Sequence, residues 1–242
     1  MMNKRQHNMS NKLFSFEYKA LVIGSGGAIG QAFVQAFQKD PQCSLVETVS
    51  RSSGGQFDLE DPGSIASAAR QLATSGPFHV IVDATGALVI DGVGPEKAMR
   101  ALRQDSLMRS FQVNAIGPAL VLREFSPLLA GGRTIYAKLS ARVGSITDNK
   151  LGGWYGYRAS KAALNMLLQT AAIELQRKNP DLRVVALQPG TVRSNLSKPF
   201  ATAIESTMAP EESATGMLSA LAAIAPRHGA HFIDYRGNEI PW

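Results

Sequence analysis

The sequence has a single cysteine, Cys43, among its 242 residues. One cysteine excludes an internal disulfide framework and is typical of a reducing compartment, so we expect a cytoplasmic protein. Long apolar runs are also missing: none approaches the roughly 20 residues that a membrane-spanning helix needs. Residues 1–18 are polar and lack the apolar core of a secretory signal. We interpret 1–18 as a partly disordered leader, and we expect no membrane partner.

Clusters of basic residues are absent too, although the net charge is +6. Lysine and arginine are dispersed and do not alternate with aromatic residues, which make up only 7% of the chain, so nucleic acid is not an expected partner. A modest positive field that attracts a phosphorylated cofactor accounts for the same charge. We assign no residue to a metal site.

Short β-type apolar runs alternate with longer segments of helical periodicity. Strands are expected at Ala20–Ile23, Ser44–Val49, Val80–Asp83, Thr134–Leu139 and Val184–Leu187. Helices are expected at Ile29–Lys39, Pro62–Thr74, Asp105–Leu129 and Tyr155–Lys178. This alternation predicts an α/β fold: a doubly wound parallel sheet of the Rossmann type, with helices on both faces. Because no linker or repeat interrupts the pattern, 19–242 is expected to form one domain.

A glycine-rich turn follows the first expected strand directly. The run Gly24-Ser-Gly-Gly-Ala-Ile-Gly30 connects that strand to the first expected helix. Backbone N–H groups and the positive end of the helix dipole then face one spot, which favours a pyrophosphate. Glycine allows the tight turn and lets the backbone approach the phosphate closely. A purely structural turn remains the alternative.

The residues after the second expected strand bear on the choice of cofactor. This strand runs into Ser50-Arg51-Ser52-Ser53. An acidic residue there would bind a ribose 2′-hydroxyl and repel a 2′-phosphate, whereas a guanidinium with hydroxyls suits a phosphate dianion. We therefore expect NADP(H) rather than NAD(H). In the alternative interpretation, Arg51 is an ordinary surface residue.

Tyr157 and Lys161 lie four residues apart at the start of a strongly predicted helix. Side chains at i and i+4 share one face, so the ammonium is expected near the phenol. A free tyrosine has a pKa near 10, and a nearby positive charge lowers that pKa by stabilising the phenolate. Such a tyrosine can exchange a proton with a carbonyl or alcohol oxygen. By itself the spacing is common and usually structural, and its weight comes from the glycine turn upstream.

These motifs together resemble the short-chain dehydrogenase/reductase family over nearly the whole chain. The matching features are Gly24–Gly30, Asp58-Leu59, Asp83-Ala-Thr-Gly86, Asn114, Tyr157-x-x-x-Lys161 and Pro189-Gly-Thr-Val-Arg-Ser194, in the family's order. The stretch Gly152–Asn165 and the tail Phe232–Trp242 look most like the C-factor-like branch of that family.

The resemblance implies a role for each matching residue. Tyr157 would be the acid–base residue, Lys161 would also hold the nicotinamide ribose, and Asn114 would anchor a water through which protons reach Lys161. Asp58 and Leu59 would border the adenine. With the glycine turn and Arg51, the expected cofactor-binding residues are Gly24, Ser25, Gly27, Ala28, Ile29, Gly30, Arg51, Ser52, Asp58, Leu59, Ala84, Thr85, Gly86, Tyr157, Lys161, Pro189, Gly190, Thr191, Val192 and Ser194.

Three positions depart from the family pattern. Ala28 replaces the usual second glycine of the turn, and Asp83-Ala84 replaces the usual Asn-Asn or Asn-Cys pair. Ala141 occupies the usual catalytic serine position, so the developing alkoxide lacks one donor. Ser140 is our candidate for the missing donor. Ser145, a water or weakened catalysis are the alternatives.

The expected function is interconversion of a carbonyl and an alcohol on a small or medium organic substrate. The alternative is an NADP(H)-binding sensor or scaffold with little turnover, suggested by Ala28 and Ala141. A homodimer or homotetramer is expected through the long helices Asp105–Leu129 and Tyr155–Lys178, where Ala162, Ala163, Ala171 and Ala172 would allow close approach. These alanines would equally suit packing on the sheet.

Overall fold

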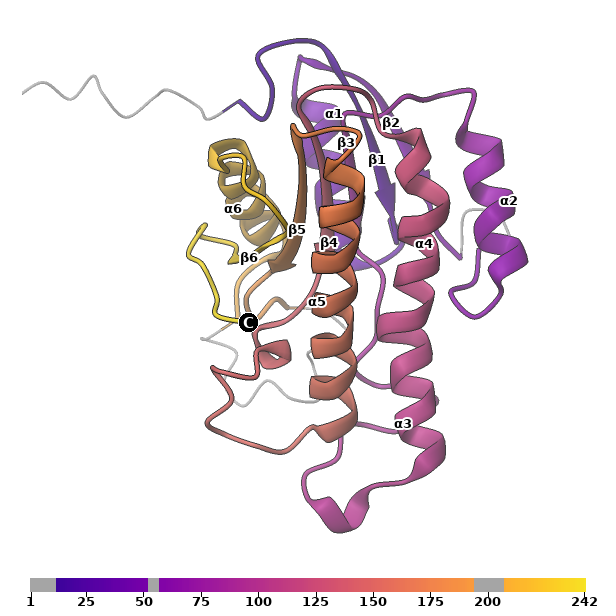
Figure 1. The fold of residues 1–242 in the computed structure, drawn as a ribbon, viewed down its shortest axis with the longest axis vertical. Coiled ribbons are helices and arrows are strands. Elements are labelled where there is room, and N and C mark those ends of the chain that lie inside the picture. Colours follow the sequence, from indigo (N-terminus) through magenta and orange to yellow (C-terminus); the bar gives the residue numbers. More distant parts are fainter. Residues whose placement is uncertain (1–11, 52–56, 194–206) are drawn as a thin grey trace, which may run out of the picture.

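The computed structural model describes residues 12–51, 57–193 and 207–242. Its centre is a six-stranded parallel sheet with the strand order β2-β1-β3-β4-β5-β6 (Figure 1). The strands are β1 (Tyr18–Ile23), β2 (Cys43–Val49), β3 (Val80–Asp83), β4 (Thr134–Leu139), β5 (Leu182–Gln188) and β6 (His231–Asp234).

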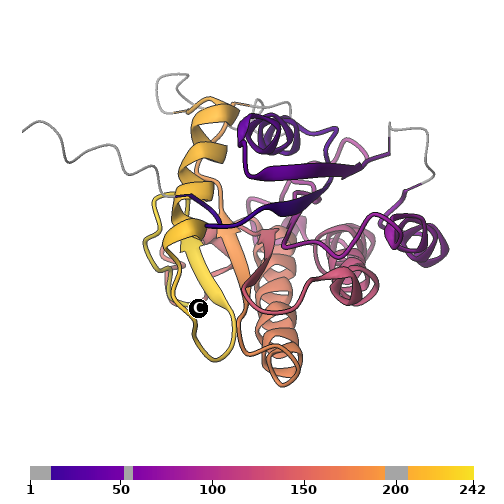
Figure 2. The ribbon, with the colours of Figure 1, turned by 90° about the horizontal axis from the view of Figure 1, so that it is seen from above.

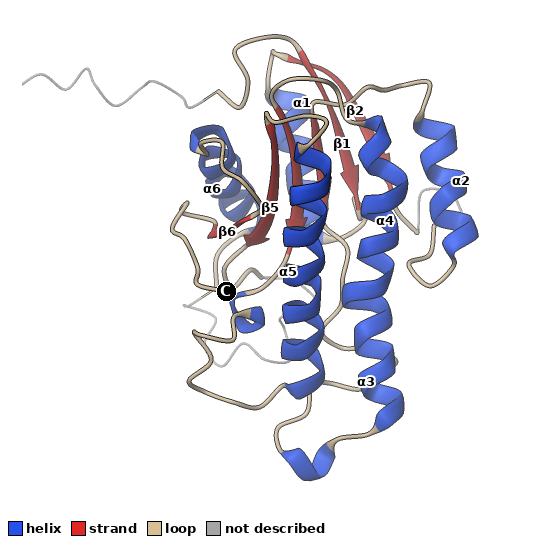
Figure 3. Ribbon diagram, viewed as in Figure 1, coloured by secondary structure: helices blue, strands red, loops and turns tan. Residues whose placement is uncertain are grey.

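Helices cover both faces of this sheet. They are α1 (Ala28–Lys39), α2 (Pro62–Leu72), α3 (Gln104–Phe111), α4 (Gly117–Phe125), α5 (Tyr155–Gln176) and α6 (Pro210–Ala223). Figure 2 shows α1 and α6 on one side of the strands and α2, α4 and α5 on the other. The layers are therefore helix, sheet, helix, as the blue and red elements of Figure 3 also show.

Strand alternation explains why the chain has two apolar cores. Leu21, Ile81 and Tyr136 face α4 and α5, and they belong to one buried cluster. Their chain neighbours Val22 and Val82 face α1 and α6 in the other cluster. Both faces of the central strands are thus buried. For this reason their sequences are continuously apolar instead of alternating between apolar and polar residues.

The sheet has a topological switch point between β1 and β3. The chain moves outward from β1 to β2, returns to β3 on the other side of β1, and then continues to β6. Helices that leave the carboxyl ends of β1 and β3 therefore diverge to opposite faces, which opens a crevice above these strand ends. The glycine turn lies at the mouth of this crevice.

The predicted fold class and all five predicted strands are confirmed, and two elements were missed. β6 and α6 were not expected, and α6 begins at Pro210. Leu13 and Phe14, which the sequence placed in the leader, are buried against the sheet. Within the described ranges, no helix is both long and apolar enough to cross a membrane.

Candidate active site

The glycine turn brings uncapped backbone amides to the end of β1. Gly24 has φ +84°, and a Cβ on it would lie 3.0 Å from the Ala84 carbonyl carbon and from the Thr85 nitrogen. Gly27 is the N-cap of α1 and supplies no side-chain hydrogen bond. The first amides of α1 have no partners within the helix. They therefore face the crevice and can donate hydrogen bonds to a bound anion.

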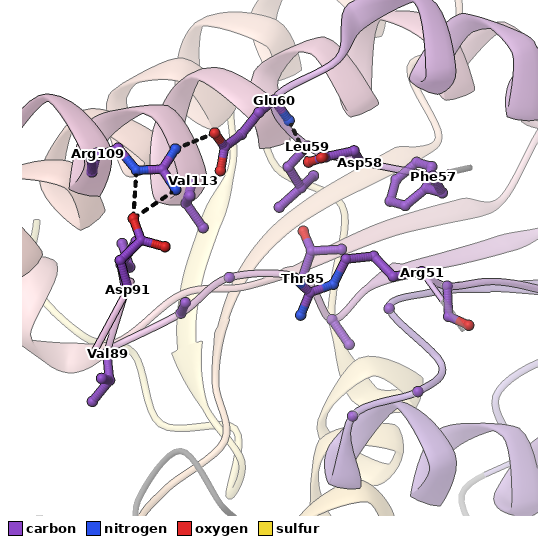
Figure 4. Close-up of a pocket in the computed structure, with 18 residues that line it drawn as sticks. Arg51, Phe57, Asp58, Leu59, Glu60, Thr85, Val89, Asp91, Arg109 and Val113 are labelled. Atoms are coloured by element: carbon purple, nitrogen blue, oxygen red, sulfur yellow. Dashed lines mark hydrogen bonds and ion pairs between the residues drawn. The ribbon is translucent and has the colours of Figure 1, made fainter. Parts of the chain in front are cut away.

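A cleft of about 620 Å³ extends from this turn along the carboxyl ends of the first three strands (Figure 4). Eight of the predicted cofactor residues line it: Gly24, Gly27, Arg51, Asp58, Leu59, Ala84, Thr85 and Gly86. The volume lies within the usual range for ligand pockets. A helix N-terminus for phosphate, a guanidinium at the end of β2 and the apolar Leu59 suit a phosphorylated dinucleotide.

An ion-pair bridge that the sequence did not reveal crosses one end of this cleft. Arg109 on α3 binds Glu60, and its Nη2 lies 2.9 Å from Asp91 Oδ2 (Figure 4). Glu60 follows the Asp58-Leu59 wall, whereas Asp91 belongs to the loop after β3. The bridge thus connects two walls of the cleft whose residues, Glu60 and Asp91, are 31 positions apart in the sequence.

Tyr157 and Lys161 share one face of α5, as predicted from their spacing. The Lys161 Nζ lies 5.7 Å from the centre of the Tyr157 ring. Tyr157 lines two further hollows of about 340 Å³ and about 450 Å³. The start of α5 is held from outside the helix, because Gly156 N donates to Glu96 Oε2 at 2.9 Å. Glu96 therefore fixes the turn that carries the phenol, another contact that the sequence did not predict.

The pKa values of this pair differ from the sequence-based expectation. Burial raises the pKa of Tyr157 to about 12, so the phenol is protonated at neutral pH. Burial, together with the charge of Lys138, lowers the pKa of Lys161 to about 7, while Asp83 opposes that change. A half-protonated lysine stabilises phenolate less than a permanent cation does, so the expected lowering of the tyrosine pKa is not what this geometry produces.

Asn114 lies in a π-helical turn, Gln112–Ile116, between α3 and α4. The side-chain amide of Asn114 makes two hydrogen bonds to the backbone of Ala87. Oδ1 accepts from Ala87 N at 2.9 Å, and Nδ2 donates to Ala87 O at 2.8 Å. Such π-turns occur often at functional sites. Here the turn directs the Asn114 side chain toward the loop after β3. The hydrogen bonds of Asn114 hold Gly86-Ala87 in place. Anchoring of a water by Asn114 stays a prediction.

The larger of the two hollows beside Tyr157 contains the position of the expected serine. Ala141 lines it with Ile29, and the predicted segment Pro189–Val192 forms another wall. Ser140 also reaches this lining, but its hydroxyl donates to Asn165 Oδ1 at 2.7 Å. A hydroxyl has one proton, so Ser140 cannot donate to a substrate oxygen while this bond exists. The geometry thus weighs against Ser140 as the missing donor.

The remaining predicted residues lie at the edges of the site or outside the described ranges. Ser25 belongs to the glycine turn, where its N–H donates to Val49 O at 3.2 Å. Ala28 is the first residue of α1, and Gly30 is buried against the turn. Ser52 and Ser194 fall outside the described residues. Two further buried charges, Asp83 and Lys138, lie under the site and were not predicted as a pair.

Fold and site together define a dinucleotide-binding oxidoreductase with a tyrosine–lysine pair, and sequence comparison agrees. The family model for short chain dehydrogenases matches residues 18–205. The chain therefore belongs to the short-chain dehydrogenase family, a family of oxidoreductases.

Individual relatives place the chain within this family. The C-signal protein of Myxococcus xanthus is 32% identical over 177 residues, which cover 72% of this chain and 99% of that protein. This match is consistent with the resemblance to the C-factor-like branch. The NADPH-bound carbonyl reductase from chicken fatty liver has a TM-score of 0.80 at 22% identity, covering 94% of this chain and 95% of that one.

A second solved structure has the same fold. The carbonyl reductase from Pseudomonas aeruginosa PAO1 in complex with NADP has a TM-score of 0.73 at 20% identity and covers 93% of this chain and 100% of that one. At these identities the structural matches establish the fold and not the substrate.

Proposed function

We propose that the protein interconverts a carbonyl and an alcohol on a small or medium organic substrate, with NADP(H) as the redox cofactor. The observation that carries this proposal is the position of Tyr157. Its phenol borders hollows next to the cofactor cleft, and Lys161 lies on the same face of α5. The nicotinamide would supply or accept the hydride when bound.

The chain's own residues hold and move the proton. At neutral pH the phenol of Tyr157 is protonated, because burial raises its pKa. It can therefore donate to a substrate carbonyl oxygen. The uncapped start of α1 and Arg51 would hold phosphates, while Asn114 and Gly86 would shape the wall between cofactor and substrate.

The test is NADPH oxidation across a panel of aldehydes and ketones, with Tyr157→Phe as the control. We expect turnover of at least one carbonyl compound that depends on Tyr157. Tight NADPH binding without Tyr157-dependent turnover of any substrate would instead favour the sensor or scaffold. That second candidate is supported by Ala141 in the pocket and by the engaged hydroxyl of Ser140.

Arg51 is expected to determine the choice between NADPH and NADH. Arg51→Gln should weaken NADPH binding about tenfold or more and leave NADH binding unchanged, because a charged hydrogen bond to the 2′-phosphate is lost. Titration calorimetry with both cofactors measures this. Arg177→Gln, at the far end of α5, is the matched control and should change neither affinity. Equal or tighter binding of NADH by the unaltered protein would contradict the role of Arg51.

Oligomeric state and location remain proposals. A homodimer or homotetramer is supported by exposed Met108 on α3 and by exposed Met166 and Leu167 on α5. Ala172 is fully buried, and Ala163 and Ala171 pack against the same core, so these alanines serve the sheet rather than a free helix face. The single Cys43 supports the cytoplasm as the compartment.

A further inference from the structure

A buried ion pair lies beneath the catalytic pair. Asp83 ends β3 and Lys138 is its in-register neighbour on β4. Their side chains are 0% and 1% exposed, and Lys138 Nζ lies 3.0 Å from Asp83 Oδ1. Burying two charges costs desolvation free energy that attraction alone often fails to repay, so such a pair is weak evidence for a purely stabilising role.

Lys138 holds the turn that lines the cofactor cleft. Its Nζ lies 2.6 Å from Thr85 O and 3.0 Å from Thr85 Oγ1, in addition to Asp83. The Thr85 hydroxyl gives its own proton to Asp83 Oδ1 at 2.6 Å, so it accepts from Lys138. Together with Asp83 O at 3.4 Å, the Lys138 Nζ has four acceptors within hydrogen-bond distance. They can occupy all three N–H groups, which only the ammonium form supplies. The hydrogen bonds thus assign a full set of protons to Lys138.

Lys161 is buried nearby with far fewer partners. In the described part of the chain, its Nζ has one hydrogen bond, to Leu139 O at 3.3 Å. Leu139 is the chain neighbour of Lys138. A Cβ built on Gly86 would lie 3.4 Å from Lys161 Nζ, so Thr85-Gly86 lies between the two lysine ammonium groups. Among the described residues, no carboxylate forms an ion pair with Lys161.

The charges around Lys161 come from several elements. Lys138 and Asp83 face it from β4 and β3, and their effects on its pKa are opposite. Tyr157 on α5 and Tyr136 on β4 are neutral near pH 7, because burial raises both pKa values. The Arg142 guanidinium is engaged with Asp148. Two lysines thus share one carboxylate, and that carboxylate binds Lys138.

We propose that Lys138, fixed by Asp83, is a positioning residue that acts through Lys161. It holds the turn Asp83–Ala87 in place and keeps a second fixed ammonium under the active site, so that Lys161 is the lysine that exchanges its proton. The proposal rests on the proposed function, in which Lys161 serves the reaction.

The test follows the side-chain signals of isotopically labelled lysines by NMR across a pH titration, and it needs no turnover. Lys161→Met identifies the Lys161 signal, and the double variant Asp83→Asn/Lys138→Met removes both charges at nearly constant volume. We expect the Lys161 signal to titrate near pH 7 in the unaltered protein. The two charges removed in the double variant act on the Lys161 pKa in opposite directions, and the Lys138 cation has the larger effect. The proton dissociation constant of Lys161 should therefore fall in that variant, by about threefold.

The controls separate charge from packing. Tyr136→Phe removes a neutral buried hydroxyl from the same strand and should leave the Lys161 titration unchanged. If Lys138→Met alone fails to fold, the double variant decides, with its thermal unfolding as the folding check. An unmoved Lys161 titration in the folded double variant, or a Lys138 signal that titrates near neutrality, would overturn the proposal. Absence of turnover with the expected titrations would instead count against the proposed function.

Discussion

Tyr157→Phe is expected to lower carbonyl turnover about a thousandfold and to leave NADPH affinity within about twofold of the unaltered protein. The phenol supplies the proton that the developing alkoxide needs, and burial keeps this phenol protonated at neutral pH. The lost hydroxyl leaves the ring and its packing against Trp154 in place. Steady-state rates with the best carbonyl substrate, together with NADPH titration, measure both quantities.

Tyr155→Phe is the matched control for this variant. Tyr155 begins the same helix two residues earlier, and it lines none of the hollows described for Tyr157. Its variant should retain the rate of the unaltered protein. A loss of less than about tenfold in Tyr157→Phe would show that another group donates the proton.

Ala141→Ser is expected to raise turnover about tenfold or more. Ala141 lines the pocket beside Tyr157, and the hydroxyl of its neighbour Ser140 is engaged by Asn165. A new hydroxyl at position 141 would stabilise the developing alkoxide, and a single oxyanion donor contributes about a hundredfold or more in acyl-transfer enzymes, where negative charge also develops on oxygen. The measurement is kcat for a carbonyl substrate at saturating NADPH.

Two companion variants make this result specific. Cysteine is nearly the same size as serine, but its thiol is a weak hydrogen-bond donor. Ala141→Cys should therefore give little or no increase in kcat. Ser140→Ala should leave turnover nearly unchanged, because the Ser140 hydroxyl donates its proton to Asn165 rather than to the substrate. A tenfold loss in Ser140→Ala, with no gain in Ala141→Ser, would return the donor role to Ser140.

The features that were predictable from the sequence depend on residues close together in the chain. The glycine turn follows its strand directly, and Tyr157 and Lys161 are one helical turn apart. Local spacing fixes such geometry before any tertiary contact forms. Continuous apolar runs likewise predicted the strands, because both faces of the central strands are buried.

The features that were missed depend on contacts between distant segments. β6 has only four residues, and its strand character comes from pairing with β5. The bond from Ser140 to Asn165 depends on how α5 packs over the end of β4, which no local pattern records. The two hydrogen bonds between the Asn114 side chain and the Ala87 backbone join residues that are 27 positions apart.

The sequence by itself determined the family, the parallel sheet, the glycine turn after the first strand and the placement of Tyr157 and Lys161 on one helix face, because each depends on short-range spacing. Only the tertiary structure decided how protons are distributed over that pair. Burial raises the pKa of Tyr157 and lowers that of Lys161. Asp83 on β3 and Lys138 on β4 form an ion pair although a long connection separates the two strands in the sequence. The register between β3 and β4 places this ion pair beneath the site. Desolvation and register are properties of the packed molecule, so the chain order alone could not show them.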